Sequence, residues 1–166
     1  EIARTKLAAE ARGIAGKWYT PTVIATEQTR ESTSFGTLST PDEVTGVEVP
    51  TNGLIAITYR AHVKSSVSGA GRAAVYIGSN QLKSENNPVE RETFSTAFGL
   101  MYTSIGGLAF SGERSFADQT TGEVVLGEQL LVFVTAGTYT VSIKFKATSG
   151  SVTAKERKLW VWTLGY

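Results

Sequence analysis

The chain has 166 residues, the size of one ordinary domain, and 41% of them are apolar, which is enough for a substantial core. Its 16 basic and 15 acidic side chains give a net charge of +1, so no strong basic field attracts nucleic acid. It has no cysteine for disulfides or thiolate metal sites, and no apolar run approaches the roughly 20 residues that span a bilayer. Because the first residue is Glu1 rather than Met, we expect a fragment or a processed product.

Thr, Ser and Gly make up about a third of the chain, a composition that favours strands and turns. A helix is predicted only for residues 1–15, where Leu7 and Ile14 lie seven positions apart on one narrow stripe. This segment is either a frayed N-terminal turn or the end of a coiled stalk. We therefore divide the chain into a short helical stalk end or linker, residues 1–16, and a β-sandwich head domain, residues 17–166.

After the first segment, stretches of alternating apolar and polar residues are separated by turn residues, and about ten short strands are predicted. In chain order they lie at 23–26, 43–49, 54–63, 72–78, 98–105, 108–111, 123–126, 130–134, 138–147 and 158–166. Two strands carry a clear inward face, made of Ile55, Ile57, Tyr59, Ala61 and Val63 in one and Tyr139, Val141, Ile143 and Phe145 in the other. Polar segments at 79–93 and 148–157 are predicted loops. The pattern predicts an all-β fold, a jelly-roll-like antiparallel β-sandwich.

The last strand, KLWVWTLGY, has two apolar faces. Alternation places Trp160, Trp162 and Leu164 on one face, and Leu159 and Val161 on the other. A sandwich has one interior, so the second face requires another burial surface. Self-association about a symmetry axis would provide it, and we predict a homotrimer. The expected interface residues are Leu7, Ile14, Trp160, Trp162, Leu164 and Tyr166.

Catalytic chemistry has little support in the residue pattern. The single histidine, His62, lies on the outward side of a strand pattern, and one imidazole without cysteines or nearby carboxylates makes a poor metal site. Glu85, Glu90 and Glu92 come closest to a carboxylate cluster, but a solvated loop explains them more simply. The segment GAGR lacks the spacing of a phosphate-binding loop. We expect no catalytic residues, no metal and no cofactor.

The polar loop is a better candidate for binding. Its amide and charged groups suit hydrogen bonding to sugar hydroxyls, although a plain solvated loop has the same composition. The candidate binding residues are Asn80, Gln81, Asn86, Asn87, Glu90 and Arg91. Aromatic side chains could stack on sugar rings, although most are expected in the core or at an interface. They are Trp18, Tyr19, Tyr76, Tyr102, Trp160, Trp162 and Tyr166.

Three segments carry a resemblance to a known family. EIARTKLAAEARG is similar to linker units of bacteriophage tail proteins. VEVPTNGLIAITYRAHVKSS followed by RAAVYIGSNQLK, and the closing AGTYTVSIKFKATSGSVTAKERKLWVWTL, resemble the C-terminal head domain of phage minor tail and tail-fibre proteins. The resemblance implies a trimeric jelly-roll head akin to complement-type and tumour-necrosis-factor-like domains, with the terminal strand near the threefold axis. Receptor contacts vary within that family, so it implies no individual binding residue.

The favoured function is a non-catalytic receptor-binding or adhesive head of a phage tail protein, which recognises a host-surface glycan or protein. It would be located in the virion, at the host surface, and would contact other virion proteins through its N-terminus. Three alternatives remain open: a structural capsid-decorating or head-fibre domain, a depolymerase tip that uses the loop glutamates, and a monomeric carbohydrate-binding module. Nucleic-acid binding and membrane insertion are not expected.

Overall fold

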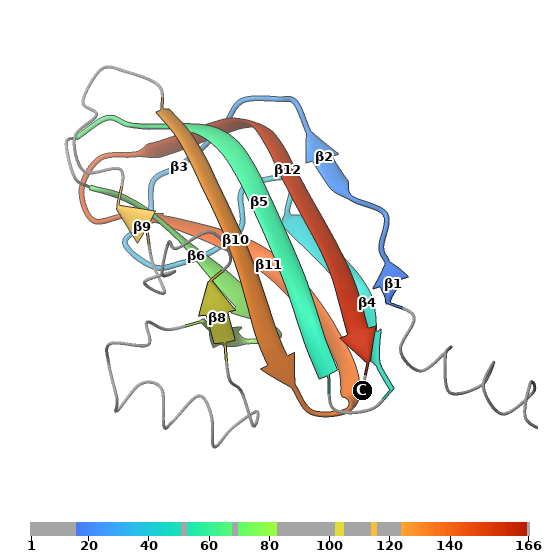
Figure 1. The fold of residues 1–166 in the computed structure, drawn as a ribbon. Coiled ribbons are helices and arrows are strands. Elements are labelled where there is room, and N and C mark those ends of the chain that lie inside the picture. The colour runs from blue at the N-terminus through green and yellow to red at the C-terminus, as the bar shows by residue number, and fades with distance from the viewer. Residues whose placement is uncertain are drawn as a thin grey trace, which may run out of the picture.

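The computed structural model describes residues 16–50, 53–67, 70–82, 102–104, 114–115 and 124–165, and these form two antiparallel sheets packed face to face (Figure 1). The seven-stranded sheet contains β1 (Lys17–Trp18), β2 (Thr22–Ile24), β3 (Gln28–Arg30), β5 (Gly53–Ser65), β8 (Tyr102–Ser104), β10 (Val124–Val134) and β12 (Val152–Gly165). The five-stranded sheet contains β4 (Asp42–Val49), β6 (Gly71–Ile77), β7 (Asn80–Gln81), β9 (Arg114–Ser115) and β11 (Gly137–Ala147).

The all-β, two-layer antiparallel sandwich predicted from the sequence is confirmed. In Figure 1, the long strands β12, β5 and β10 lie side by side in one layer, and β4, β11 and β6 form the layer behind them. Short strands β1, β2 and β3 follow one another along the far edge of β12. The predicted helix at 1–15 lies outside the described residues. Within the described residues, no helix is long and apolar enough to cross a membrane.

The core forms between the two sheets from the alternating residues of β5 and β11. All five predicted inward residues of β5 are buried, as are Val141, Ile143 and Phe145 of β11. Tyr139 is half-buried and packs against the same core. Every second side chain of these central strands is therefore buried, as the alternating sequence pattern predicts, and the hydrophobic effect stabilises this arrangement.

Two predicted strands, 123–126 and 130–134, are one continuous strand. Gly127 interrupts the apolar pattern, which is why the sequence suggested a break. In the structure β10 pairs with β5 without interruption, from Val124 opposite Val63 to Val134 opposite Gly53. Pairing with β5 keeps this segment in a strand, although the residues around Gly127 have a low intrinsic preference for strands. The predicted strand at 108–111 lies outside the described residues.

The predicted loop at 148–157 is wrong in its second half, because β12 already begins at Val152. Val152 and Ala154 are buried, so the segment alternates as a strand should. The alternation is hidden by a β-bulge between Lys155 and Lys158, where the register with β5 shifts. Glu156 has a φ of 48°, a left-handed conformation that is unusual for a residue other than glycine. The bulge turns the charged Arg157 into the core.

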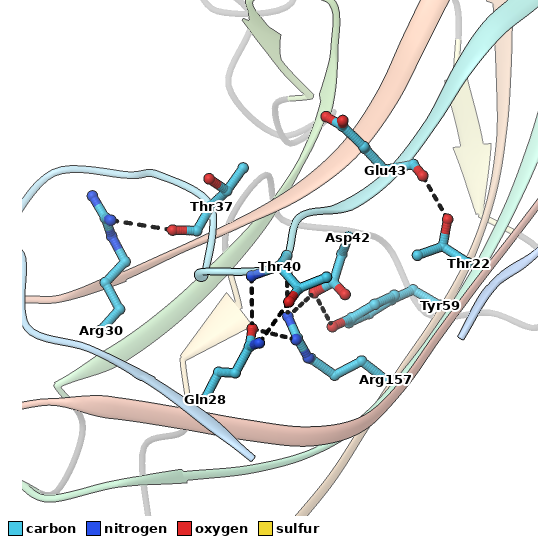
Figure 2. A network of polar contacts seen from close by, with 9 residues as sticks. All are labelled: Thr22, Gln28, Arg30, Thr37, Thr40, Asp42, Glu43, Tyr59 and Arg157. Atoms are coloured by element: carbon cyan, nitrogen blue, oxygen red, sulfur yellow. Dashed lines mark hydrogen bonds and ion pairs between the residues drawn. The ribbon is translucent and has the colours of Figure 1, made fainter. Parts of the chain in front are cut away.

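Arg157 is at the centre of a buried polar network that joins the two sheets (Figure 2). Its guanidinium, 0% exposed, donates from Nη1 to Asp42 Oδ2 at 3.0 Å and from Nη2 to Gln28 Oε1 at 2.6 Å. The hydroxyl of Tyr59 donates to the same Asp42 oxygen at 3.1 Å. Gln28 also accepts a hydrogen bond from the backbone N–H of Thr40 at 3.0 Å. Because Asp42 belongs to β4 and its partners Tyr59 and Arg157 belong to β5 and β12, the network fixes one sheet against the other.

The network changes the titration of both of its acidic groups. Burial raises the pKa of Asp42, while the positive charge of Arg157 and the hydrogen bond from Tyr59 oppose that shift. Burial, together with the nearby Asp42 carboxylate, raises the pKa of the Tyr59 hydroxyl well above its usual range. Arg157 is the group that most strongly opposes the rise in the pKa of Asp42.

We expect Arg157→Met to lower the free energy of unfolding by about 3–5 kcal/mol at neutral pH, because Asp42 then lacks its buried partner. Without Arg157 the pKa of Asp42 rises further, so protonated Asp42 is favoured in the folded state. The loss relative to the unsubstituted chain should therefore shrink as the pH falls from about 7 to about 4. Urea unfolding at both pH values measures it.

Lys64→Met is the matched control, because Lys64 forms an exposed ion pair with Glu27 at 3.3 Å. Its removal should change the free energy of unfolding by less than about 1 kcal/mol. Equal losses for the two variants at neutral pH would contradict a structural role for the buried network.

Candidate functional site

The last strand has two apolar faces, as its sequence predicted. Leu159 and Val161 of β12 are fully buried between the sheets. Trp160 and Trp162 point to the opposite, outer face of the seven-stranded sheet, where they are half-buried. Leu164 lies at the end of the same outer series and is exposed. Within this chain, therefore, the inner face of β12 is covered by the second sheet and the outer face is open to solvent.

Trp18 extends this outer face across the edge of β12. Strand β1 places Trp18 directly opposite Trp162, and the two indole rings stack with centroids 4.8 Å apart and planes 20° apart. Trp18 is nevertheless 70% exposed. All three tryptophans of the chain thus gather on one surface, which we name the aromatic patch: Trp18, Leu54, Trp160, Trp162 and Leu164.

Neighbouring polar contacts hold β1 in place. Lys17 Nζ forms an ion pair with Glu48 Oε2 at 3.0 Å. The Tyr19 hydroxyl accepts a hydrogen bond from the Glu48 backbone N–H at 2.7 Å, and the Tyr19 N–H donates to the Val161 carbonyl at 3.1 Å. The residues on both sides of Trp18 are therefore tied to β4 and β12, so the exposed ring is held at a defined position.

Strand β5 provides the floor of the aromatic patch. Ala56 pairs with Trp162, Thr58 with Trp160, and Leu54 with Leu164. Ala56 is fully buried although it belongs to the outward series, so larger neighbouring side chains cover it.

The outer face changes character beyond Trp160. In the next row Lys158 lies opposite Arg60, and both side chains are exposed. Further along, His62 Nε2 lies 3.3 Å from Glu156 Oε2, so this histidine is a strand residue on the outward side, as predicted. The face therefore has an aromatic half near the end of β12 and a basic half near its bulge.

The predicted polar loop is only partly described. Asn80 and Gln81 form β7, which pairs with β6, and both are half-buried. Gln81 Oε1 accepts a hydrogen bond from the Tyr76 hydroxyl at 3.4 Å. Both belong to the five-stranded sheet, so the structure does not bring them together with the aromatic patch. The other loop candidates lie outside the described residues: Glu85, Asn86, Asn87, Glu90, Arg91 and Glu92.

Of the predicted interface residues, Trp160, Trp162 and Leu164 share the aromatic patch, while Leu7, Ile14 and Tyr166 lie outside the described residues. The trimer itself stays a prediction. Sequence reasoning named Trp18 as a stacking candidate but did not join it to Trp162. Among the described residues, no group of three or more His, Asp or Glu side chains could hold a metal ion.

No protein-family model and no curated protein matches the chain. Among solved structures, it is similar to the C-terminal CBM6 of LamC, a marine laminarinase from Zobellia galactanivorans. The TM-score is 0.34 at 16% identity, over 87% of this chain and 99% of that one. It is also similar to the carbohydrate-binding module CBM6cm-2 of Cellvibrio mixtus lichenase 5A, solved with cellotriose. There the TM-score is 0.27 at 15% identity, over 92% and 98% of the two chains.

The chain is thus a β-sandwich with structural similarity to two carbohydrate-binding modules. At these TM-scores the similarity carries no argument about a ligand or a binding residue. The bacteriophage family inferred from the sequence remains a prediction.

We expect Trp18→Ala to lower the free energy of unfolding by only about 0.5–1.5 kcal/mol, the usual value of an aromatic pair, because most of the ring is already in water. The control is Leu159→Ala in the core of the same sheet, which should cost about 2–5 kcal/mol. Urea unfolding compares the two variants. An equal loss of unfolding free energy in the two variants would mean that Trp18 stabilises the fold as a core residue does, rather than lying on an open surface.

Proposed function

We propose that this domain is a non-catalytic glycan-binding module whose polysaccharide ligand binds along the aromatic patch. The observation that carries the proposal is the exposed stack of Trp18 on Trp162, with Trp160 in the next row. Soluble domains normally bury large aromatic side chains, and an exposed cluster of them indicates an interaction surface.

The chemistry of the patch supports a sugar chain as the ligand. A pyranose ring presents C–H groups on its faces and hydroxyls at its rim, so it can stack on an indole and still hydrogen-bond to polar neighbours. Thr58, Lys158 and Arg60 border the patch and provide such neighbours. Successive outward residues of one strand lie about 6.8 Å apart, which gives an extended polymer several contacts along β12.

Binding tests this proposal directly. A panel of soluble polysaccharides should include at least one polymer that binds, measured by affinity electrophoresis and calorimetry. Trp162→Ala should weaken that binding by about 30-fold, the effect of losing a central aromatic contact worth about 2 kcal/mol. Trp18→Ala should weaken it in the same direction.

The matched control is Tyr76→Ala, which removes a half-buried aromatic ring from the outer side of the five-stranded sheet. It should leave the affinity unchanged. Because the module holds its ligand without cleaving it, the polymer should keep its length after incubation. Two results would contradict the proposal. One is an equal loss of affinity in Tyr76→Ala and Trp162→Ala, and the other is that the unsubstituted domain binds no polysaccharide of the panel.

A second candidate is the homotrimeric head of a bacteriophage tail protein, located in the virion and attached to a host-surface glycan or protein. The apolar character of the same face favours it, since Leu164 is 39% exposed beside Trp162 and Val23 is 59% exposed beside Lys158. In this assembly the aromatic patch would be buried between copies, and any receptor site would lie elsewhere. A structural role in the capsid would use the same interface.

Light scattering behind a sizing column separates the two candidates. The trimer predicts three times 17.7 kDa, about 53 kDa, and dissociation by Trp162→Glu. A mass of 17.7 kDa that does not change with concentration would leave the patch free for glycan and contradict the trimer.

A further inference from the structure

Two cations face each other on the outer surface next to the aromatic patch. Lys158 of β12 pairs in register with Arg60 of β5, and both side chains are exposed. The next row toward the end of β12 is Trp160 opposite Thr58. Residues on one face of a strand are spaced by about 6.8 Å, so the cation pair borders the aromatic patch directly.

This arrangement is unfavourable for the isolated domain. Like charges directly opposite each other across two strands destabilise the pair. Other charged residues of this face have partners, since Lys64 pairs with Glu27 at 3.3 Å and His62 lies 3.3 Å from Glu156. In the part of the chain that the structure describes, the side chains of Arg60 and Lys158 have no hydrogen bond and no ion pair. Features that reduce stability at a surface are typical of functional sites.

We infer that the ligand is an acidic polysaccharide, whose carboxylate or sulfate groups bind Arg60 and Lys158 while its sugar rings stack on the tryptophans. This inference rests on the proposed glycan-binding function and names its substrate class. The guanidinium of Arg60 can donate two parallel hydrogen bonds to a planar carboxylate or to two sulfate oxygens, and Lys158 adds a mobile positive charge. An anion between the two cations removes their repulsion, so binding relieves an unfavourable contact.

A neutral glucan would use only half of this surface, because it has no group for the cation pair. Single-stranded nucleic acid also combines rings with negative charge. Its binding sites, however, carry a basic groove that follows the backbone over several nucleotides. Two neighbouring cations without a side-chain partner among the described residues, in a chain of net charge +1, fit a ligand with anionic groups at intervals along a sugar chain better.

The test compares acidic polymers with neutral counterparts of the same sugar backbone: polygalacturonate against its methyl ester, and cellulose sulfate against soluble cello-oligosaccharides. Binding to at least one acidic polymer should be about tenfold tighter than to its neutral partner at low salt. Raising the salt from about 50 to about 200 mM should reduce that difference. The two arms separate carboxylate from sulfate as the recognised group.

The double variant Arg60→Gln/Lys158→Gln should bind the acidic polymer about tenfold more weakly and the neutral polymer within about twofold of the unsubstituted domain. Its thermal midpoint should stay the same or rise, because a repulsive pair is removed. The control, Lys144→Gln/Lys146→Gln, removes the same charge from β11 in the other sheet and should bind like the unsubstituted domain.

The outcomes distinguish this inference from the proposed function. If the Arg60/Lys158 double variant binds acidic polymers normally while Trp162→Ala does not, the glycan site stands and the acidic ligand is overturned. If single-stranded oligothymidylate binds more tightly than every acidic polymer, the acidic polysaccharide is also overturned. If the unsubstituted domain binds none of the polymers, both the function and its substrate class fail.

Discussion

The ion pair between Arg157 and Asp42 constrains the whole sandwich, because it is a charged contact inside the core between strands of different sheets. A buried charge without its partner is strongly unfavourable, so β12 and β4 are restricted to the alignment in which the two groups meet. Gln28 and Tyr59 add directional hydrogen bonds, which further restrict the relative positions that the strands can take. Hydrophobic packing alone is less selective, since apolar side chains tolerate small shifts.

With β12 held in this alignment, one of its faces packs in the core and the other is open to solvent. Leu159 and Val161 fill the space between the sheets, and Trp160 and Trp162 must then face outward. The exposed aromatic side chains are thus not a failure of core formation, since the core is complete without them. The rigid position of the strand also suits recognition, because a site built on sheet strands loses little conformational freedom when a ligand binds.

Alternation in the sequence was sufficient to predict the sandwich, the buried faces of β5 and β11, and the two apolar faces of β12. It failed at residues 148–157, because a bulge breaks the period of two and Arg157 is a residue type that rarely belongs to a core. The stack of Trp18 on Trp162 and the pairing of Arg60 with Lys158 were not predictable either. Both depend on strand register between segments far apart in the chain, which a single sequence does not specify.

The bulge at Glu156 shifts the alternation of inward and outward side chains in β12 by one residue. Upstream of it, even-numbered positions such as Val152 and Ala154 face the core; downstream, odd-numbered positions such as Leu159 and Val161 do. If the same sequence ran through this point in regular alternation, without the bulge, every later side chain of β12 would exchange faces. Two indoles would then compete for the interior and two aliphatic side chains would face water. The extra residue of the bulge thus keeps the aliphatic side chains of β12 in the core and its two indoles on the outer surface.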